Sequence, residues 1–456
     1  MSEPGQRETW SSATMFILAA IGGAVGFGSI WRFPYLIGTN GGPAFVIVYL
    51  VLLVAITIPL MMAETLMGRR GQASAPASMR RLAAEIGASQ GWVVVGGLGV
   101  LGAFMIMTYY SMIGGWVLAY IPESLTAGFA GRTREEFQAA FDGLMASPGR
   151  MIFWHTAFMG VTALIVGRGI TAGIERAVGF LMPALVVMLA AITVYALFIG
   201  DADAGLAFMF VPDFGKVNWE MILIALGQAF FSIGVGMGMM FTYGAYLQSD
   251  VSIGKACVTI VVADTVVSLL SGLAIFPIVF GFGLDPAAGP GLVFVTLPLA
   301  FAQMPGGLIV GTAFFVLLFF AGLASALALT EVPVAWLGEK RGWTRGRATA
   351  LVAAGIWAIG LLCILSFNEL KDVHPLRDVG RYATATLYDI IDDISANVVL
   401  VIDGILIAVF VGFVMTRETV MAELGMTDSA LFRTWMFFTR IFTPIALVVT
   451  LLATWW

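Results

Sequence analysis

Long apolar runs separated by short polar segments make up most of the chain. A helix needs about 20 apolar residues to cross the hydrocarbon core of a bilayer. The runs lack the period-two alternation that the strands of a membrane β-barrel require. The pattern therefore predicts an all-α membrane protein with eleven transmembrane helices, near residues 12–37, 43–68, 92–122, 151–167, 174–199, 219–247, 252–282, 306–338, 346–367, 394–416 and 432–455.

Composition supports this prediction and excludes several other classes of protein. Hydrophobic residues make up 60% of the chain and charged residues 11%, whereas a soluble domain carries about 25% charged residues. The net charge of −5 provides no basic face for nucleic acid. Neither nucleotide-binding fingerprints nor metal-ligand spacings occur, so we expect no organic cofactor and no enzyme.

The distribution of positive charge predicts the orientation in the membrane. Lys and Arg are about twice as frequent in the loops on the side of the N-terminus as in those on the other side. The first ten residues are polar and lead directly into the first apolar run without a cleavage site. We therefore expect a multi-pass protein of the inner (plasma) membrane, with a cytoplasmic N-terminus and a C-terminus outside.

Glycine clusters predict that two spans are broken inside the membrane. Gly22, Gly23, Gly26 and Gly28 lie in the first span, and the segment 234–238 of the sixth holds three more glycines. Such glycines also serve helix packing. However, interrupted helices at matching places of two halves indicate a transport site at the bilayer midplane. We predict a single domain, 1–456, with one five-span repeat at about 12–199, a second at about 219–416 and an extra helix at about 432–455.

Several long motifs resemble the neurotransmitter:sodium symporter family. They are GGAVGFGSIWRFPYLIGTNGG in the first span, PLMMAETLMGR in the second, YYSMIGGW in the third, GQAFFSIGVGMGMMFTYGAYL in the sixth and FFAGLASALALTE in the eighth. This resemblance implies a LeuT-like fold with two inverted five-helix repeats and unwound helices 1 and 6. It also implies sodium-driven symport of amino acids or amines.

The resemblance implies a substrate pocket in which the Tyr110 hydroxyl and free backbone N–H groups hold a carboxylate. Amine transporters of the family place an acidic residue near Gly23 and Ala24, and its absence here favours an α-amino acid. Gly234 and Met237 suggest room for a bulky hydrophobic side chain. The implied lining residues are Ala24, Gly26, Gly28, Ile106, Tyr110, Phe231, Ser232, Gly234, Met237, Ser325 and Leu329.

The resemblance also implies two sodium ions held by oxygen ligands. The first would use the Ala24 carbonyl, Ser29, Ser232, Asp264 and the substrate carboxylate. The second would use the carbonyls of Gly22, Val25 and Ala321 with the Ser325 hydroxyl. Ser29 replaces the family's usual Asn, and Ala324 replaces a usual Thr or Asp. The change at Ala324 removes one side-chain ligand from the second site, and both changes bear on how well sodium would bind.

Asp264 lies inside the seventh apolar run, where a carboxylate costs about 2.5–3.5 kcal/mol to insert and is a functional candidate. Animal members of the family have Asn here and bind chloride beside it. The chloride-type positions match as Tyr49, Gln228, Ser232 and Ser268, so we predict that the Asp264 charge replaces chloride.

Glu64 is a second acidic residue within an apolar run. By resemblance, its carboxylate binds the unwound backbone of spans 1 and 6. The alternative is a residue at the membrane interface, close to Arg69 and Arg70.

Charge pairs are implied as gates on the two sides of the pocket. On the outside, Arg32 would pair with Asp393, or alternatively with Asp392, and Phe231 would cover the substrate. On the inside, Arg7 would pair with Glu339 while Trp10 packs the N-terminus in place.

The expected partners are an amino acid and the lipid bilayer, and the oligomeric state stays open. Two other functions remain possible from the sequence. The changes at Ser29 and Ala324, with Asp264 able to carry a proton, are compatible with a proton-coupled or ion-independent exchanger. Broken helices also occur in channels and in sensors that bind without transporting.

Overall fold

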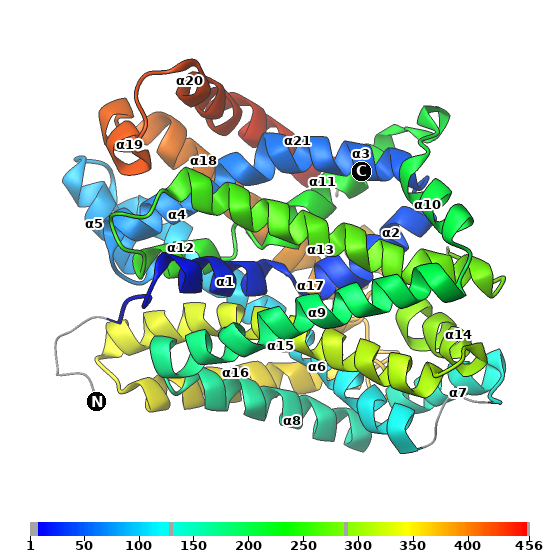
Figure 1. Cartoon of the computed structure of the whole chain (residues 1–456). Coiled ribbons are helices and arrows are strands. Elements are labelled where there is room, and N and C mark those ends of the chain that lie inside the picture. Colours follow the sequence, from blue (N-terminus) through cyan, green and yellow to red (C-terminus); the bar gives the residue numbers. More distant parts are fainter. Residues whose placement is uncertain (1–7, 127–130, 287–290, 454–456) are drawn as a thin grey trace.

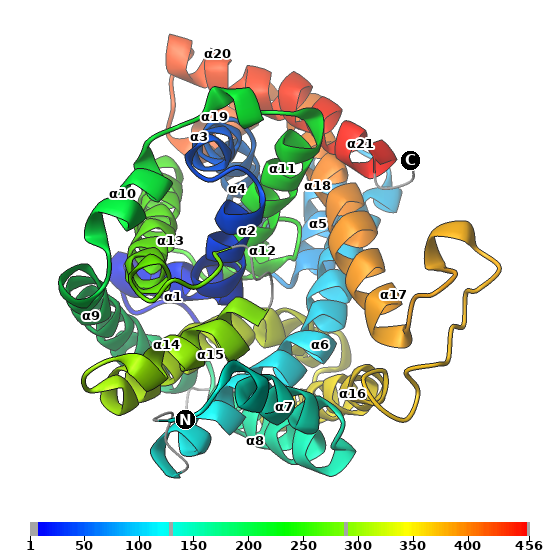
Figure 2. The same cartoon turned by 90° about the vertical axis from the view of Figure 1, so that its right-hand side faces the viewer.

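The computed structural model describes residues 8–126, 131–286 and 291–453. Within these ranges every regular element is helical and no strand occurs. Figure 1 shows the long helices lying side by side, and Figure 2 shows the same bundle viewed from one end. The predicted all-α architecture is confirmed.

Nine helices of the described chain are long and apolar enough to span a membrane. They are Pro43–Gly71, Gln90–Leu125, Pro148–Val166, Ile170–Ile199, Ile253–Gly281, Gly307–Arg341, Arg345–Leu365, Leu387–Val414 and Ala430–Ala453. A tenth candidate is a pair, Ala13–Ala24 and Gly28–Thr39, bent by 53° at its break. The structure therefore contains the predicted break in the first span.

The sixth apolar run is divided as well. Helix α11 (Trp219–Ile233) ends at Gly234, and α12 (Met239–Ala245) begins after Gly238. Gly234, Gly236 and Gly238 have φ of 72°, 79° and 66°, a conformation that side chains with a Cβ rarely adopt. The backbone is therefore unwound where the glycines predicted it. Because neither half alone spans a bilayer, the count of eleven stays a prediction.

The remaining elements surround these two broken segments. The apolar spans contain α3 (Pro43–Leu52), α4 (Ile58–Gly71), α6 (Val93–Thr126), α8 (Pro148–Val166), α9 (Arg176–Ile199), α13 (Ile253–Gly281), α15 (Gly307–Arg341), α16 (Arg345–Leu365), α18 (Leu400–Val409) and α21 (Thr443–Ala453). Shorter helices flank them: α2 (Phe33–Thr39), α5 (Ala75–Glu85), α7 (Arg134–Met145), α10 (Ala202–Phe210), α14 (Leu297–Gln303), α17 (Leu387–Asp393), α19 (Arg417–Leu424) and α20 (Ala430–Phe437).

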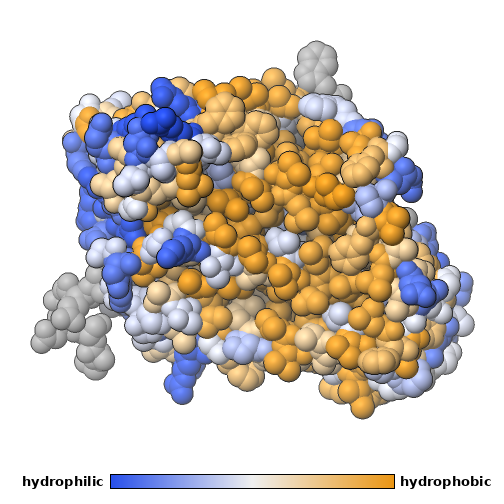
Figure 3. Space-filling view, turned by 45° about the horizontal axis from the view of Figure 1, so that its top comes forward, coloured by the Kyte–Doolittle hydropathy of each residue, from blue (hydrophilic) through white to orange (hydrophobic). Residues whose placement is uncertain are grey.

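Packing places the broken helices in the interior. Helix α1 (Ala13–Ala24) packs on α15, α13 and α9, while α12 packs on α4. Helix α15 also contacts α6 along much of its length. Figure 3 shows a broad hydrophobic face with hydrophilic residues gathered toward the ends, which is the distribution expected of a protein surrounded by lipid.

Candidate functional site

The break in the first span brings bare backbone against two hydroxyl groups. A Cβ on Gly26 would lie 2.5 Å from Ser325 Oγ and 2.6 Å from the Tyr110 hydroxyl. Helix α1 ends at Ala24, and its cap residue Val25 has a ψ of 89°. Only glycine therefore allows the unwound chain to approach α6 and α15 this closely.

A cavity of about 30 Å³ lies between the two breaks. All eleven residues predicted to line the substrate pocket surround it: Ala24, Gly26, Gly28, Ile106, Tyr110, Phe231, Ser232, Gly234, Met237, Ser325 and Leu329. Gly23 and Met239 complete the lining. Apart from backbone, the polar groups in this lining are hydroxyls, since none of its side chains is acidic or basic.

Tyr110 is held against the unwound backbone of the first span. Its hydroxyl accepts a hydrogen bond from the Phe27 N–H at 3.3 Å. The Tyr110 and Phe27 rings are stacked, with centroids 4.7 Å apart. The hydroxyl also interacts with the Ser325 side chain, so it lies between Phe27 and Ser325 at the edge of the cavity, where a carboxylate could accept its proton.

Methionine side chains fill the space beside Gly234. A Cβ at Gly234 would lie 3.3 Å from Met239 Cε and 3.4 Å from Met237 Sδ. The glycine thus leaves no large free volume, contrary to the simplest interpretation of its missing side chain. A bulky ligand can enter only if these flexible thioether side chains move.

An oxygen cluster lies directly beside the cavity. The Ser29 hydroxyl donates to Asp264 Oδ1 at 2.5 Å, and the Ser232 hydroxyl donates to Asp264 Oδ2 at 2.8 Å. The two hydroxyl oxygens are 3.5 Å apart, and Asp264 is fully buried. A carboxylate with converging hydroxyls is a hard-oxygen donor set, which fits a small alkali cation.

The second predicted ion site is poorer in side-chain oxygen. The Ser325 hydroxyl donates to the Gly22 carbonyl at 3.1 Å. The Ala324 methyl group would lie 3.2 Å from a Cβ placed on Gly22. Val25 and Ala321, whose carbonyls were also predicted as ligands, are fully buried. An ion here would depend on backbone carbonyls and one hydroxyl.

The chloride-type positions gather around Ser232. The Tyr49 hydroxyl donates to Ser232 Oγ at 3.4 Å, and Gln228 Nε2 donates to the Gly28 carbonyl at 3.0 Å. Within the described ranges, the Ser268 hydroxyl and Gln228 Oε1 are buried without a hydrogen-bond partner. Asp264 is the acidic side chain that Ser232 contacts in this polar region.

Glu64 fixes the unwound part of the sixth span. Its Oε2 accepts from the Gly236 N–H at 3.0 Å and its Oε1 from the Phe241 N–H at 3.2 Å. Among the described residues it makes no hydrogen bond to the first span, in contrast to our expectation. Glu64 is fully buried in the protein.

The outer charge pair differs from the one that the motif implied. Asp393 interacts with the Arg381 guanidinium and accepts from the Tyr382 hydroxyl at 2.5 Å. Arg32 instead lies over the Phe231 ring, 4.9 Å from its centroid, and Asp392 is the carboxylate in electrostatic contact with it. Arg381 therefore pairs with Asp393, while the charge of Arg32 acts on Asp392 without an ion pair within 4.0 Å among the described residues.

The N-terminal segment is anchored by Trp10. Its side chain is 1% exposed, and its Nε1 donates to the Tyr243 carbonyl at 3.0 Å. Arg7 lies outside the described residues. Its predicted partner Glu339 accepts from the Ser74 N–H at 2.6 Å.

The sequence analysis did not predict the ion pairs that Arg345 makes close to Trp10. Arg345 pairs with buried Glu331 and lies 3.6 Å from Glu8. The Tyr246 hydroxyl also donates to Glu331, at 2.9 Å. The signal was an acidic residue, Glu331, within the apolar run 306–338.

Asp403 is a second buried acid that the motifs did not indicate. It is 1% exposed within Leu387–Val414, and its Oδ1 has no hydrogen-bond partner in the described part of the chain. Glu64 is the charged group that acts on it. A carboxylate in VIDGILI was the available signal.

Comparisons with known proteins agree with this geometry. The model of the sodium:neurotransmitter symporter family matches residues 7–138 and 135–455. The uncharacterized sodium-dependent transporter YhdH of Bacillus subtilis is 35% identical, covering 97% of this chain and 96% of the relative. The sodium- and chloride-dependent taurine transporter of Bos taurus is 25% identical over 79% of this chain and 66% of its own.

A solved structure supports the fold over nearly the whole length. The crystal structure of MhsT in complex with L-phenylalanine superposes with a TM-score of 0.90 and 40% identity, covering 98% of this chain and 100% of the other. The predicted LeuT-like fold is therefore confirmed. The chain belongs to the sodium:neurotransmitter symporter family, which is a family of secondary transporters.

Proposed function

We propose that the chain is a sodium-coupled symporter that imports a hydrophobic α-amino acid by alternating access. The observation that carries this proposal is the Asp264 carboxylate, which accepts the Ser29 and Ser232 hydroxyls beside a cavity lined by both broken helices. Ser232 belongs to both the oxygen cluster and the cavity. A cation at the cluster and a carboxylate in the cavity would therefore stabilise each other.

Sodium is the proposed coupling ion because the donor set consists of hard oxygens and because relatives such as the Bacillus subtilis protein are named sodium-dependent. We assign one ion to Ala24, Ser29, Ser232 and Asp264. A second is assigned to the backbone and Ser325 hydroxyl near Gly22. The second would bind more weakly, since Ala324 offers a methyl group instead of an oxygen.

The substrate proposal rests on the lining of the cavity. Tyr110 would donate to the substrate carboxylate, and the substrate side chain would contact Ile106, Met237 and Leu329. MhsT was crystallised with L-phenylalanine, which supports an apolar amino acid here as well. Closure would follow from Phe231 under Arg32 on one side and from the Trp10 anchor on the other.

Chloride independence is a further part of the proposal. Asp264 supplies a fixed negative charge among Tyr49, Gln228 and Ser268, where an anion would otherwise balance sodium. The bovine relative is named chloride-dependent, so the two proteins provide a direct contrast. We also propose the predicted orientation, with the Trp10 end of the bundle in the cytoplasm of a cell whose inner membrane holds the protein.

Reciprocal binding measurements test the coupling. The affinity of purified protein for labelled phenylalanine is measured at increasing sodium, with choline keeping the ionic strength constant. We expect sodium to lower the Kd by about 10-fold or more, and phenylalanine to raise sodium affinity by the same factor. An amino-acid Kd that does not depend on sodium would contradict the proposal.

A further inference from the structure

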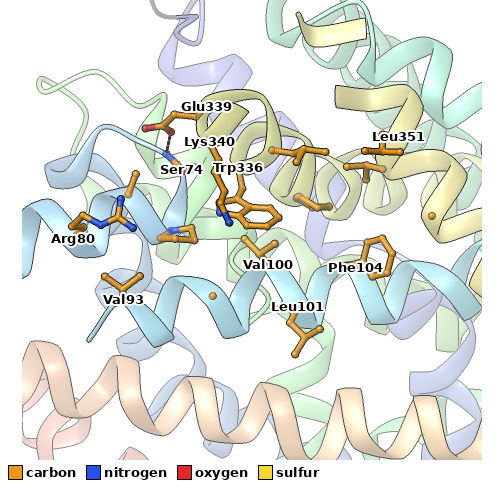
Figure 4. Close-up of a pocket in the computed structure, with 17 residues that line it drawn as sticks. Ser74, Arg80, Val93, Val100, Leu101, Phe104, Trp336, Glu339, Lys340 and Leu351 are labelled. Atoms are coloured by element: carbon orange, nitrogen blue, oxygen red, sulfur yellow. Dashed lines mark hydrogen bonds between the residues drawn. The ribbon is translucent and has the colours of Figure 1, made fainter. Parts of the chain in front are cut away.

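A groove of about 970 Å³ shares no lining residue with the substrate cavity, although both are lined by α6 and α15. Helices α5, α6, α15 and α16 form its walls (Figure 4). Its volume is far larger than that of the substrate cavity. Of its lining, only Glu339 was predicted to take part in transport, as the inner gate partner of Arg7, so the rest of the groove needs a separate explanation.

The wall of the groove beyond its charged mouth is apolar, and part of it is exposed at membrane depth. Val100, Leu101 and Phe104 of α6 line it together with Leu351 and Val352 of α16. Leu101 is 45% exposed and Leu351 53% exposed, although both lie within membrane spans. At such positions, exposed apolar side chains contact lipid chains and not water.

The mouth of the groove is basic. Arg80 comes from α5, and Lys340 comes from the last turn of α15. Within the described residues, neither side chain has a carboxylate oxygen within 4.0 Å. The Lys340 ammonium lies 4.7 Å from the centre of the Trp336 ring.

One acidic residue also lines the mouth. Glu339 accepts the Ser74 N–H at 2.6 Å, so one of its oxygens is already engaged at the start of α5 (Figure 4). The two cations Arg80 and Lys340 remain without an ion pair in this part of the chain. The mouth therefore has an excess of positive charge next to an interfacial tryptophan.

We propose that this groove is a binding site for one anionic phospholipid. Its phosphate would be held by Arg80 and Lys340, and one acyl chain would lie along Leu101, Phe104 and Leu351. Basic pockets between transmembrane helices bind anionic headgroups, and the charged mouth continues directly into an apolar wall at membrane depth. A soluble anion would fit the mouth but would leave the wall unused.

A lipid bound in the groove would contact helices that also carry residues of the substrate cavity or adjoin such helices. Helix α15 also carries Ser325 and Leu329 of the substrate cavity, and α5 follows α4, which carries Glu64. A lipid held between α5 and α15 would therefore stabilise the end of the bundle that contains Trp336. This inference requires only that the protein spans a membrane, so it does not depend on the substrate or on sodium.

Native mass spectrometry of the purified full-length protein tests the proposal. The protein is mixed with phosphatidylglycerol or phosphatidylcholine, and retained lipid is counted as the detergent is removed. We expect one phosphatidylglycerol to be retained at concentrations at least about 10-fold lower than for phosphatidylcholine. The double variant Arg80→Gln/Lys340→Gln should lose this preference, whereas Arg134→Gln/Lys216→Gln, with the same change of charge, should keep it.

A second variant fills the apolar part of the groove without changing its charge. No atom lies within 4 Å of a Cβ placed on Gly97, so Gly97→Phe can project into the groove. It should reduce phosphatidylglycerol retention while leaving phenylalanine binding unchanged. Equal retention of the two lipids, or full retention by the Arg80/Lys340 variant, would overturn the proposal. Retention that appears only after deletion of residues 1–7 would also overturn it, because the chain's own N-terminus would then occupy the groove.

Discussion

The Ser29 hydroxyl donates to the Asp264 carboxylate at 2.5 Å, linking the break of the first span to the middle of α13. These residues are 235 positions apart in the chain. Ser29 stands at the position where the family's usual residue is Asn. Its side chain is shorter, yet its hydroxyl reaches the Asp264 carboxylate directly. A cation arriving here would compete with two serine protons for the same oxygens.

According to the proposed role of Asp264, the Asp264→Asn variant should take up its substrate faster when chloride is present. The variant loses the fixed negative charge but keeps the shape of the side chain. In chloride-free gluconate medium, we expect uptake to fall by about 10-fold or more, because the cation loses its charged partner. Adding chloride should restore part of the uptake.

Thr265→Ala is the matched control for this test. Its hydroxyl donates only to the Val261 carbonyl of its own helix, at 2.8 Å. Uptake by this variant should match that of the unmodified protein in both media. If Asp264→Asn were equally active with and without chloride, the counter-charge assignment would fail.

Tyr110→Phe should weaken amino-acid binding without unfolding the protein. A hydrogen bond to a charged group contributes about 1.5–3 kcal/mol, so the Kd should rise by about 10-fold or more. Tyr120→Phe removes a comparable hydroxyl from the same helix, one that donates to the Phe294 carbonyl at 3.0 Å. That control should bind the substrate normally, and equal losses in the two variants would indicate a general packing effect.

Asp392→Asn and Asp393→Asn separate the two candidate partners of Arg32. Asp393 is held by Arg381 near the surface, and such partly exposed pairs contribute about 0–1 kcal/mol. We expect Asp392→Asn to reduce uptake by about 10-fold and Asp393→Asn to have a much smaller effect. The reverse order, measured in the same vesicles, would return Asp393 to the gate.

Met237→Ala should enlarge the cavity and shift the preference toward larger side chains. Small changes of side-chain volume in an apolar pocket alter selectivity by about 10–200-fold. The ratio of kcat/KM for tryptophan over leucine should therefore rise. Met240→Ala, which is buried outside the cavity lining, should leave the ratio unchanged. An unaltered ratio in both variants would show that Met237 does not limit the size of the substrate.

Local sequence signals predicted the parts of the site that depend on backbone chemistry. Glycine spacing located both breaks, and the span motifs located the residues that now surround one cavity. Both signals work because an unwound segment needs glycine wherever φ is positive or another backbone group approaches. Gly234 and Gly26 meet these two requirements.

The partners of charged side chains were harder to predict. Asp393 is neutralised by Arg381 from the preceding loop, and Arg345 reaches Glu331 across a turn. Among the described residues, the Glu64 carboxylate accepts hydrogen bonds from the sixth span and not from the first. Neighbouring acids such as Asp392 and Asp393 look equivalent in the sequence, and only the packing of the helices decides which of them faces Arg32.

Accumulation of a labelled amino acid in proteoliposomes tests the central claim most directly. Vesicles containing the protein are given labelled phenylalanine with either an inward sodium gradient or potassium in its place. The account predicts concentrative uptake with sodium, little uptake with potassium, and loss of the sodium effect when an ionophore collapses the gradient. Equal uptake in the two salts that responds to pH would contradict sodium coupling at Asp264 and would favour a proton-coupled exchanger.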